Sequence, residues 1–150
     1  MKYKVEIDID LPRDRVIELF DSTENLYKWQ DGLQSFEHIS GDPGQAGAKS
    51  KLVFKMGKRN MELVETITKR ELPDEFNGTY DTKGVFNVVN NRFTETAPGK
   101  TRWESENEFQ FQGFMKVIGF VMKGAFPKQS LKYMKDFKAF AEDGKDVRES

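Results

Sequence analysis

Residues 102–111 read RWESENEFQF, and large apolar side chains alternate there with charged or polar ones. Trp103, Phe109 and Phe111 fall on one side of an extended chain, together with the small polar residues Ser105 and Asn107. The other side carries an arginine, three glutamates and a glutamine. An alternation with period two predicts a β-strand that has one covered face and one face in water.

The C-terminal region supplies a cover for that strand. Leu131, Met134, Phe137 and Phe140 recur at helical spacing, with lysines on the opposite side. This pattern predicts a long amphipathic helix whose lysine-rich side is solvated. Pro127 suits either the start of this helix or a kink in it.

Further strands are expected upstream of residue 102. Similar alternation, interrupted by glycine and proline turns, predicts strands near 3–10, 33–40, 49–56, 61–68, 76–81 and 85–96. Two short helices follow the first strand: one begins at Pro12, and one is capped by Ser22 or Thr23 and ends near Trp29. About seven antiparallel strands around a long C-terminal helix make an α+β fold.

Composition limits the function classes. The chain has 150 residues, a size that suits a single domain over residues 1–142 followed by a polar C-terminal tail at 143–150. The absence of cysteine excludes disulfides and thiolate chemistry, and the charged N-terminus does not resemble a signal peptide, so a cytoplasmic location is expected. A net charge of −1 argues against nucleic-acid binding. The apolar stretch 114–126 is too short to span a bilayer, so no integral membrane association is expected; a homodimer remains open.

The order of elements resembles that of the START-like, or polyketide cyclase/dehydrase (SRPBCC), superfamily, whose fold is called the helix-grip. Local features that match are the Leu11-Pro12 helix entry, Trp29, the glycine-rich turn at 41–48, the stretch 65–73 and the strand entry at 100–103. The resemblance implies a cavity between the curved sheet and the long helix that binds or carries lipids, sterols, polyketides or other apolar molecules. Some members of this superfamily are aromatases or cyclases. The superfamily has no universal catalytic residue, so no catalytic position can be carried over.

No recognisable catalytic, metal or cofactor motif occurs in the sequence. His38 is the only histidine, and it cannot form a zinc site without further imidazoles or thiols. No G-x-S-x-G, G-x-G-x-x-G or phosphate-loop pattern is present, so no cofactor is expected. Three functions remain open: a carrier of a hydrophobic small molecule, a cyclase or aromatase, and an interaction protein that uses the lysine side of the last helix on a membrane surface.

The candidate ligand-binding residues are those assigned to the covered faces of the strands and to the C-terminal segments. Apolar pockets use a few polar groups to orient a ligand, so polar residues on these faces belong to the set. The candidates are Trp29, Phe54, Met56, Met61, Leu63, Glu65, Tyr80, Asn91, Trp103, Ser105, Asn107, Phe109, Met115, Ile118, Met122, Met134 and Phe137.

Two of these assignments carry explicit alternatives. Glu65 can face the cavity with a raised pKa and act as an acid or base, or it can pair with a neighbouring Arg or Lys, turn outward, or hydrogen-bond to Asn107. The apolar, glycine-containing segment 114–124 can be a lid at the mouth of the cavity or an ordinary buried helical turn.

Overall fold

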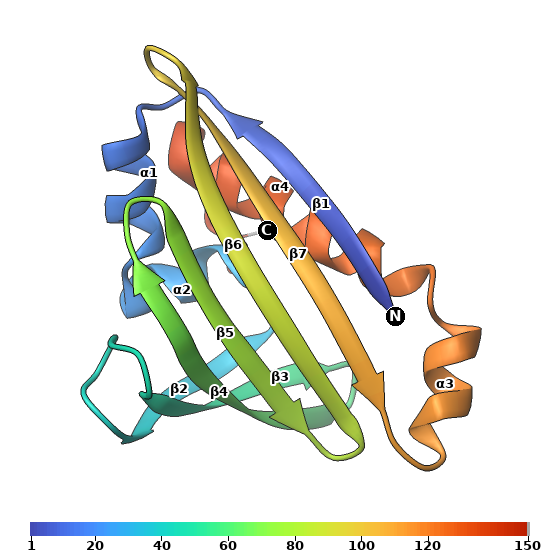
Figure 1. Ribbon diagram of the computed structural model, residues 1–150. Coiled ribbons are helices and arrows are strands. Elements are labelled where there is room, and N and C mark those ends of the chain that lie inside the picture. The colour runs from blue at the N-terminus through green and yellow to red at the C-terminus, as the bar shows by residue number, and fades with distance from the viewer. Residues whose placement is uncertain (150) are drawn as a thin grey trace.

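A computed structural model describes residues 1–149 of the chain, and a single curved antiparallel sheet dominates it (Figure 1). The strand order in the sheet is β1-β7-β6-β5-β4-β3-β2, so the first two strands of the sequence form its two edges. The strands are β1 (Lys2–Ile9), β2 (Leu33–Ser40), β3 (Lys49–Met56), β4 (Arg59–Glu71), β5 (Glu75–Thr82), β6 (Val85–Ala97) and β7 (Lys100–Phe111).

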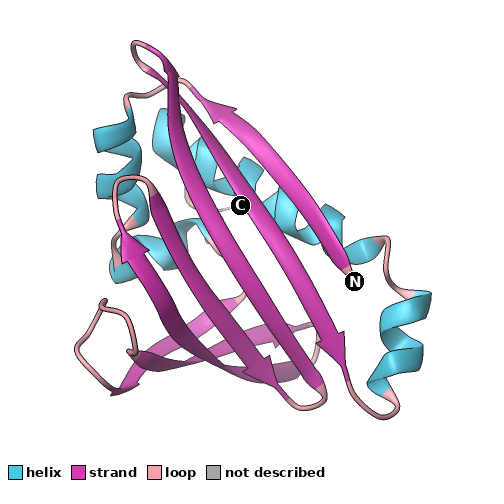
Figure 2. Ribbon diagram, in the orientation of Figure 1, coloured by secondary structure: helices cyan, strands magenta, loops and turns pink. Residues whose placement is uncertain are grey.

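Four helices accompany the sheet, and three of them cover its inner, concave face (Figure 2). They are α1 (Arg13–Phe20), α2 (Thr23–Trp29), α3 (Met115–Val121) and α4 (Ala125–Asp143). The long helix α4 runs along β1 and β7, whereas the short α3 lies beyond the end of β7. The α+β architecture expected from the sequence is therefore confirmed.

The local signals explain where these helices begin. Ser22 caps α2, because its hydroxyl accepts a hydrogen bond from the Asn25 amide at 3.2 Å. Pro12 lies immediately before α1 and accepts the first helical hydrogen bonds through its carbonyl. Pro127 lies in the first turn of α4, where a missing N–H group leaves no helical hydrogen bond unmade. Proline therefore starts α4 and does not kink it.

Helix α4 is held against β1 by polar contacts at both ends of that strand. The Tyr3 hydroxyl lies 2.6 Å from the Ser130 hydroxyl. The Lys138 ammonium donates to the Asp8 carbonyl at 2.6 Å and also binds the carboxylate of Glu142. These contacts fix the helix relative to one edge of the sheet.

The main core fills the end of the interior nearest α1 and α2. We call this part the packed half; it consists of Ile9, Val16, Trp29, Phe93, Trp103, Met134, Phe137 and Phe140. Its aromatic rings meet mostly edge to face, with the Phe20 ring 5.0 Å from Phe93 and 5.5 Å from Trp103. A second, smaller cluster of Leu33, Leu52 and Phe54 lies under β2 and β3. The core is thus divided in two.

Candidate functional site

The other end of the interior is less completely buried. Its inner-face side chains are only partly buried, although pairing places them on the same face as the packed core. We call this part the open half; it consists of Met61, Leu63, Glu65, Tyr80, Asn87, Val89, Phe109 and Phe111. An inward side chain that keeps accessible surface borders space that other side chains do not occupy. The open half is therefore the candidate site.

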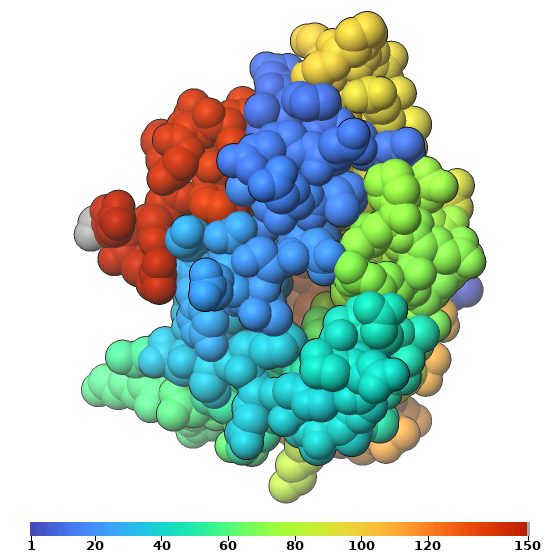
Figure 3. Space-filling view, turned by 90° about the vertical axis from the view of Figure 1, so that its left-hand side faces the viewer, coloured from blue at the N-terminus to red at the C-terminus, as the bar shows by residue number. Residues whose placement is uncertain are grey.

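The surface is hollowed on the side of the molecule nearest α2. Figure 3 shows this hollow between the blue α2, the light-green β5 and the teal segment that follows β2. Near this side, Arg70 of β4 forms a two-pronged ion pair with Asp21 at the end of α1, with one contact at 2.9 Å. The ion pair links the sheet to the helices beside the hollow.

Glu65 and Tyr80 form the central polar pair of the open half. They lie directly opposite each other on β4 and β5, because Glu65 pairs with Tyr80 in the register of the sheet. The Tyr80 hydroxyl donates a hydrogen bond to the Glu65 carboxylate at 2.8 Å. Within residues 1–149 no ion pair includes Glu65. Glu65 therefore faces inward with a neutral partner; it neither pairs with Arg or Lys nor bonds to Asn107.

Burial changes the acidity of both groups. Loss of water raises the pKa of the Glu65 carboxyl above its ordinary value, and the hydrogen bond from Tyr80 offsets only part of this effect. Burial also raises the pKa of the Tyr80 hydroxyl well above its usual value, and the neighbouring carboxylate raises it further. Tyr80 thus stays protonated as a donor, while Glu65 can exchange a proton closer to neutral pH than an exposed glutamate.

Other polar groups on the inner face are paired among themselves. Asn91 accepts a hydrogen bond from the Trp103 indole at 2.9 Å, and Asn107 donates to the Ser105 hydroxyl at 3.0 Å. Asn87 donates to the carbonyl of Glu108 at 3.2 Å. By contrast, the buried indole N–H of Trp29 has no acceptor in the described part of the chain.

No protein-family model and no curated protein matches the sequence. Solved structures do match the fold. The aromatase/cyclase Zhui from Streptomyces sp. R1128 superposes with a TM-score of 0.79 at 10% identity, over 95% of this chain and 93% of that chain. A conserved protein from Geobacillus kaustophilus gives a TM-score of 0.77 at 16% identity, over 97% of both chains. Ara h 8.0201 gives 0.73 at 15% identity, over 94% of this chain and 97% of that chain.

The chain has the START-like helix-grip fold. Superposition over nearly the full length of proteins with this architecture decides the point, together with the long helix held inside a curved sheet. At these low identities the helix-grip fold is shared, whereas the ligand has to be argued from the residues of this chain.

The helix-grip geometry places the sequence-predicted site residues in three environments. Met61, Leu63, Glu65, Tyr80 and Phe109 line the open half, and Ser105 and Asn107 are buried beside it. A second group contributes to the solid cores instead: Trp29, Phe54, Asn91, Trp103, Met134 and Phe137. A third group lies at the periphery: Met56, Met115, Ile118 and Met122.

The peripheral group agrees least with the prediction that these residues bind a ligand. Met56 ends β3 and is 56% exposed, because the strand runs past the part of the sheet that is covered. Met122 follows α3 and is 49% exposed. The structure therefore does not bring these two methionines to the open half.

The segment expected to form a lid or a buried turn is the short helix α3. One side of it packs on the end of β7, and its other side is exposed, so a fully buried turn is wrong. Met115 and Ile118 are partly buried on the packed side. Lid motion stays a prediction.

Several lining residues escaped the sequence-based candidate set. Ser50 lies opposite Glu65, and Val89 lies opposite Asn107. The alternation of side chains along each strand was the available signal, since Ser50 has the same parity as Leu52. Tyr133 of α4 also escaped; it contacts both hydrophobic clusters and lies one position from the predicted Met134.

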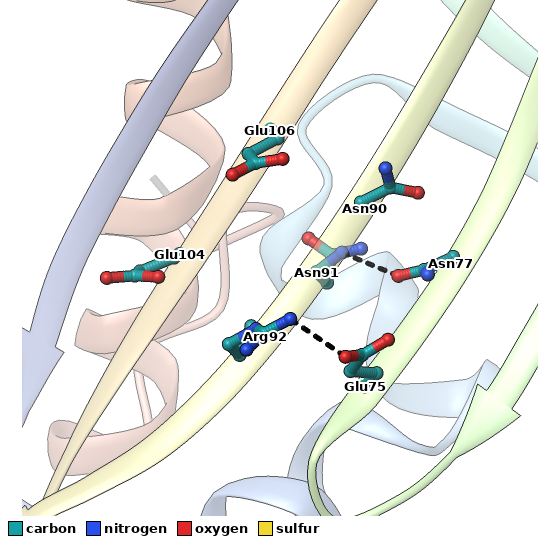
Figure 4. Close-up of a pocket in the computed structure, with 7 residues that line it drawn as sticks. All are labelled: Glu75, Asn77, Asn90, Asn91, Arg92, Glu104 and Glu106. Carbon is teal, nitrogen blue, oxygen red and sulfur yellow. Dashed lines mark hydrogen bonds and ion pairs between the residues drawn. The ribbon is translucent and has the colours of Figure 1, made fainter.

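A depression on the outer face of the sheet is less suited to an apolar ligand. It encloses about 110 Å³ and is lined by polar and charged side chains (Figure 4). Its charges are largely compensated, with Arg92 2.9 Å from Glu75 and Lys4 3.4 Å from Glu104. A second depression, of about 490 Å³, is also lined mostly by polar and charged side chains, among them Lys2, Lys4 and Glu108. Small-molecule pockets are mostly apolar. The open half is therefore the better candidate.

Proposed function

We propose that the protein binds a small hydrophobic molecule in the open half, between the curved sheet and α4. The observation that carries the proposal is the Glu65–Tyr80 hydrogen bond on an inner face whose apolar side chains keep accessible surface. Apolar walls with a few placed polar groups are the usual composition of a small-molecule site. The aromatic side chains Phe109 and Phe111 supply flat apolar surface for such a ligand.

The polar groups narrow the class of ligand. Glu65 has no cation beside it, so an anionic ligand would meet electrostatic repulsion in a poorly solvated site. A neutral hydroxyl would instead donate to the carboxylate. The protonated carboxyl, which the raised pKa of Glu65 favours, would donate to a carbonyl oxygen of the ligand. The proposed ligand is therefore neutral, largely apolar and hydroxyl- or carbonyl-bearing.

A matched pair of valines tests this proposal. Val89 faces the open half, and its neighbour Val88 faces outward on the same strand. Titration with Nile red, a neutral solvatochromic dye, measures binding in each variant. Val89→Trp fills the open half and is expected to weaken dye binding about tenfold or more, whereas Val88→Trp leaves it unchanged. Equal dye affinity in both variants, with both folded by circular dichroism, would overturn the proposal.

Native mass spectrometry of the purified protein gives an independent readout. A co-purified neutral molecule of low polarity is expected in the wild type and is lost in Val89→Trp. An anionic molecule retained at the same level by both valine variants would contradict the assigned ligand class.

A second candidate function is cyclisation of a reactive polyketone chain, and Glu65, which has no cationic partner within residues 1–149, favours it. Its carboxylate would remove a proton from a carbon between two carbonyl groups. The resulting carbanion would add to a second carbonyl of the same chain, forming a carbon–carbon bond. The new alkoxide would regain a proton from the protonated Glu65. Such acid–base catalysis contributes typically about 10²–10⁴ in rate.

A short poly-β-ketone thioester is a suitable probe for this second function. Product formation followed by absorbance is expected in the wild type and falls at least about 100-fold in Glu65→Gln. The control Glu62→Gln, on the outer face of the same strand, keeps the activity. No cyclised product above the uncatalysed background in the wild type would dispose of the cyclase and leave the binding proposal standing.

A further inference from the structure

The region around α3 gathers most of the exposed apolar side chains of the molecule. Eight large apolar residues are well exposed in the described part of the chain, and five of them lie within nine consecutive positions. They are Phe114 (74% exposed), Val117 (55%), Phe120 (73%), Val121 (74%) and Met122 (49%). Contiguous exposed apolar surface of this kind marks an interaction site. We call these five residues the α3 patch.

The α3 patch is fixed in an outward direction by packing on the other side of the helix. Gly119 is buried against the Phe111 ring, so closely that an added Cβ would lie 2.7 Å from a ring carbon. The Gln112 amide also donates to the Gly84 carbonyl at 2.9 Å, which ties the start of this segment to the β5–β6 hairpin. Figure 1 shows α3 projecting from one corner of the molecule.

The charges around the α3 patch have one sign. Residues 109–135 contain five lysines and no acidic residue, although the whole chain carries a net charge of −1. Lys116, Lys123 and Lys128 form no ion pair within residues 1–149. The Lys123 ammonium lies 5.4 Å from the centre of the exposed Phe120 ring. Aromatic and aliphatic side chains flanked by lysines are typical of segments that lie in a membrane interface.

We propose that the α3 patch docks the protein on the surface of an anionic lipid bilayer. Phe114, Phe120 and Val121 enter the headgroup region, while the lysines on either side contact lipid phosphates. The attachment is peripheral: no helix within residues 1–149 is both long and apolar enough to cross a membrane. A projecting convex helix also suits a deformable lipid surface better than it suits a preformed protein groove.

The position of α3 would bring a docked bilayer close to the proposed binding site. The Phe126 ring lies 4.7 Å from the Phe109 ring and 5.7 Å from the Phe111 ring, and both of these phenylalanines belong to the open half. Gly119 of α3 packs on the same Phe111 ring, so a bilayer in contact with α3 lies next to one end of the open half. The docking itself needs no bound ligand, so it stands or falls separately from the proposed function.

Vesicle co-sedimentation of the full chain tests the proposal. Wild-type protein is expected to bind phosphatidylcholine vesicles that contain phosphatidylglycerol, and binding weakens with added salt and with pure phosphatidylcholine. The double variant Phe120→Ser/Val121→Ser is expected to lose binding at least about tenfold. Lys116→Gln and Lys123→Gln should each weaken binding about fivefold. Ile39→Ser removes another exposed apolar side chain, on β2 and outside the α3 patch, and should change nothing.

Two further measurements make the outcome decisive. In Phe120→Trp, fluorescence is expected to shift to the blue on mixing with anionic vesicles and to be quenched by brominated lipid, which reports insertion directly. Circular dichroism checks that each variant is folded. Absence of binding by the wild type at low ionic strength would overturn the proposal. So would light scattering that shows a dimer split by the double variant without any vesicle binding, because the α3 patch would then join two copies of the chain.

Discussion

At the scale of single residues, Glu65 combines two properties that rarely occur together. It is a buried carboxyl with a hydrogen-bond donor, and it has no cation to balance its charge. Buried acids in structural roles are usually paired, because an uncompensated charge in a poorly solvated site is costly. Ionisation of Glu65 therefore lowers the free energy of unfolding, by an amount that depends on pH.

The pH dependence of stability reports this cost. The folded protein holds the Glu65 proton more tightly than the unfolded chain, because the pKa is raised above its ordinary value of 4.5. This carboxyl therefore lowers the free energy of unfolding as the pH rises from 4.5 through the raised pKa. Glu65→Gln should lack this decline, as measured by urea unfolding at a series of pH values. Glu62→Gln, on the outer face, should keep it; identical profiles for all three proteins would contradict the assignment.

Removing the Tyr80 hydroxyl, which donates to Glu65, should make ionisation of Glu65 more costly to the folded protein. Tyr80→Phe leaves the buried carboxylate without a partner, so we expect a loss of about 1–3 kcal/mol in the free energy of unfolding at neutral pH. The loss should shrink at acidic pH, where Glu65 is protonated. Urea unfolding of Tyr80→Phe and of the double variant with Glu65→Gln separates the two contributions. A loss that is the same at every pH would show that Tyr80 acts only through packing.

The sequence left both the face and the partner of Glu65 open. The alternation of Met61, Leu63 and Glu65 along β4 indicated an inward carboxyl, but it did not exclude an ion pair or an outward turn. Its hydrogen bond to Tyr80 depends on the register between β4 and β5, which a bulge after Ile67 shifts. Register is a property of the assembled sheet, and the pattern of a single strand does not contain it.

At the scale of elements, the contact between α3 and β7 depends on a single glycine. A side chain at position 119 would meet the Phe111 ring, which itself packs against Phe109 and Phe126. The close approach therefore requires a residue without Cβ. The contact decides how α3 is presented to its surroundings.

Substitution of this glycine tests the element directly. Gly119→Val should cost about 1–3 kcal/mol in the free energy of unfolding, because either the Phe111 ring or α3 must move. It should also expose Lys116 and Lys123 to faster trypsin cleavage. Gly124→Ala is the matched control, since a Cβ there meets no atom within 4 Å. Equal stability and equal proteolysis of the two variants would show that α3 is not anchored at Gly119.

Element boundaries followed from local signals where those signals are strong. Alternation in β7 and the cap at Ser22 were each sufficient. The apolar stretch 114–124 was ambiguous, because its composition is that of a buried segment and most of its apolar side chains are exposed. Only the packing of Gly119 on Phe111, a contact between two elements, decides which side of α3 faces outward.

At the scale of the whole molecule, we expect the packed half to provide most of the stability and the open half to provide the binding surface. Phe137 of the packed half is fully buried, whereas Phe109 of the open half keeps accessible surface. Both residues come from the same kind of sequence pattern, so periodicity alone could not distinguish them. The difference arises from the two short helices, because α1 and α2 contribute Val16 and Trp29 to the packed half and cover only that end of the sheet.

Truncation of these two phenylalanines should reveal the division. Phe137→Ala is expected to cost about 3–5 kcal/mol in the free energy of unfolding, as is usual for a fully buried ring. Phe109→Ala should cost less and should weaken Nile red binding more. Urea unfolding and dye titration on the same samples provide both quantities. A reversed order of the two losses would contradict the division of the interior.

The pairing of β1 with β7 also determines when the fold can form. Lys2 lies opposite Glu108 and Ile9 lies opposite Thr101, so the first strand of the sheet in sequence order bonds only to the last. Before β7 and α4 have been synthesised, the apolar side of β1 has neither its neighbouring strand nor its covering helix. Contacts between distant parts of a chain slow folding. The nascent protein must therefore keep β1 out of wrong associations until β7 has been synthesised.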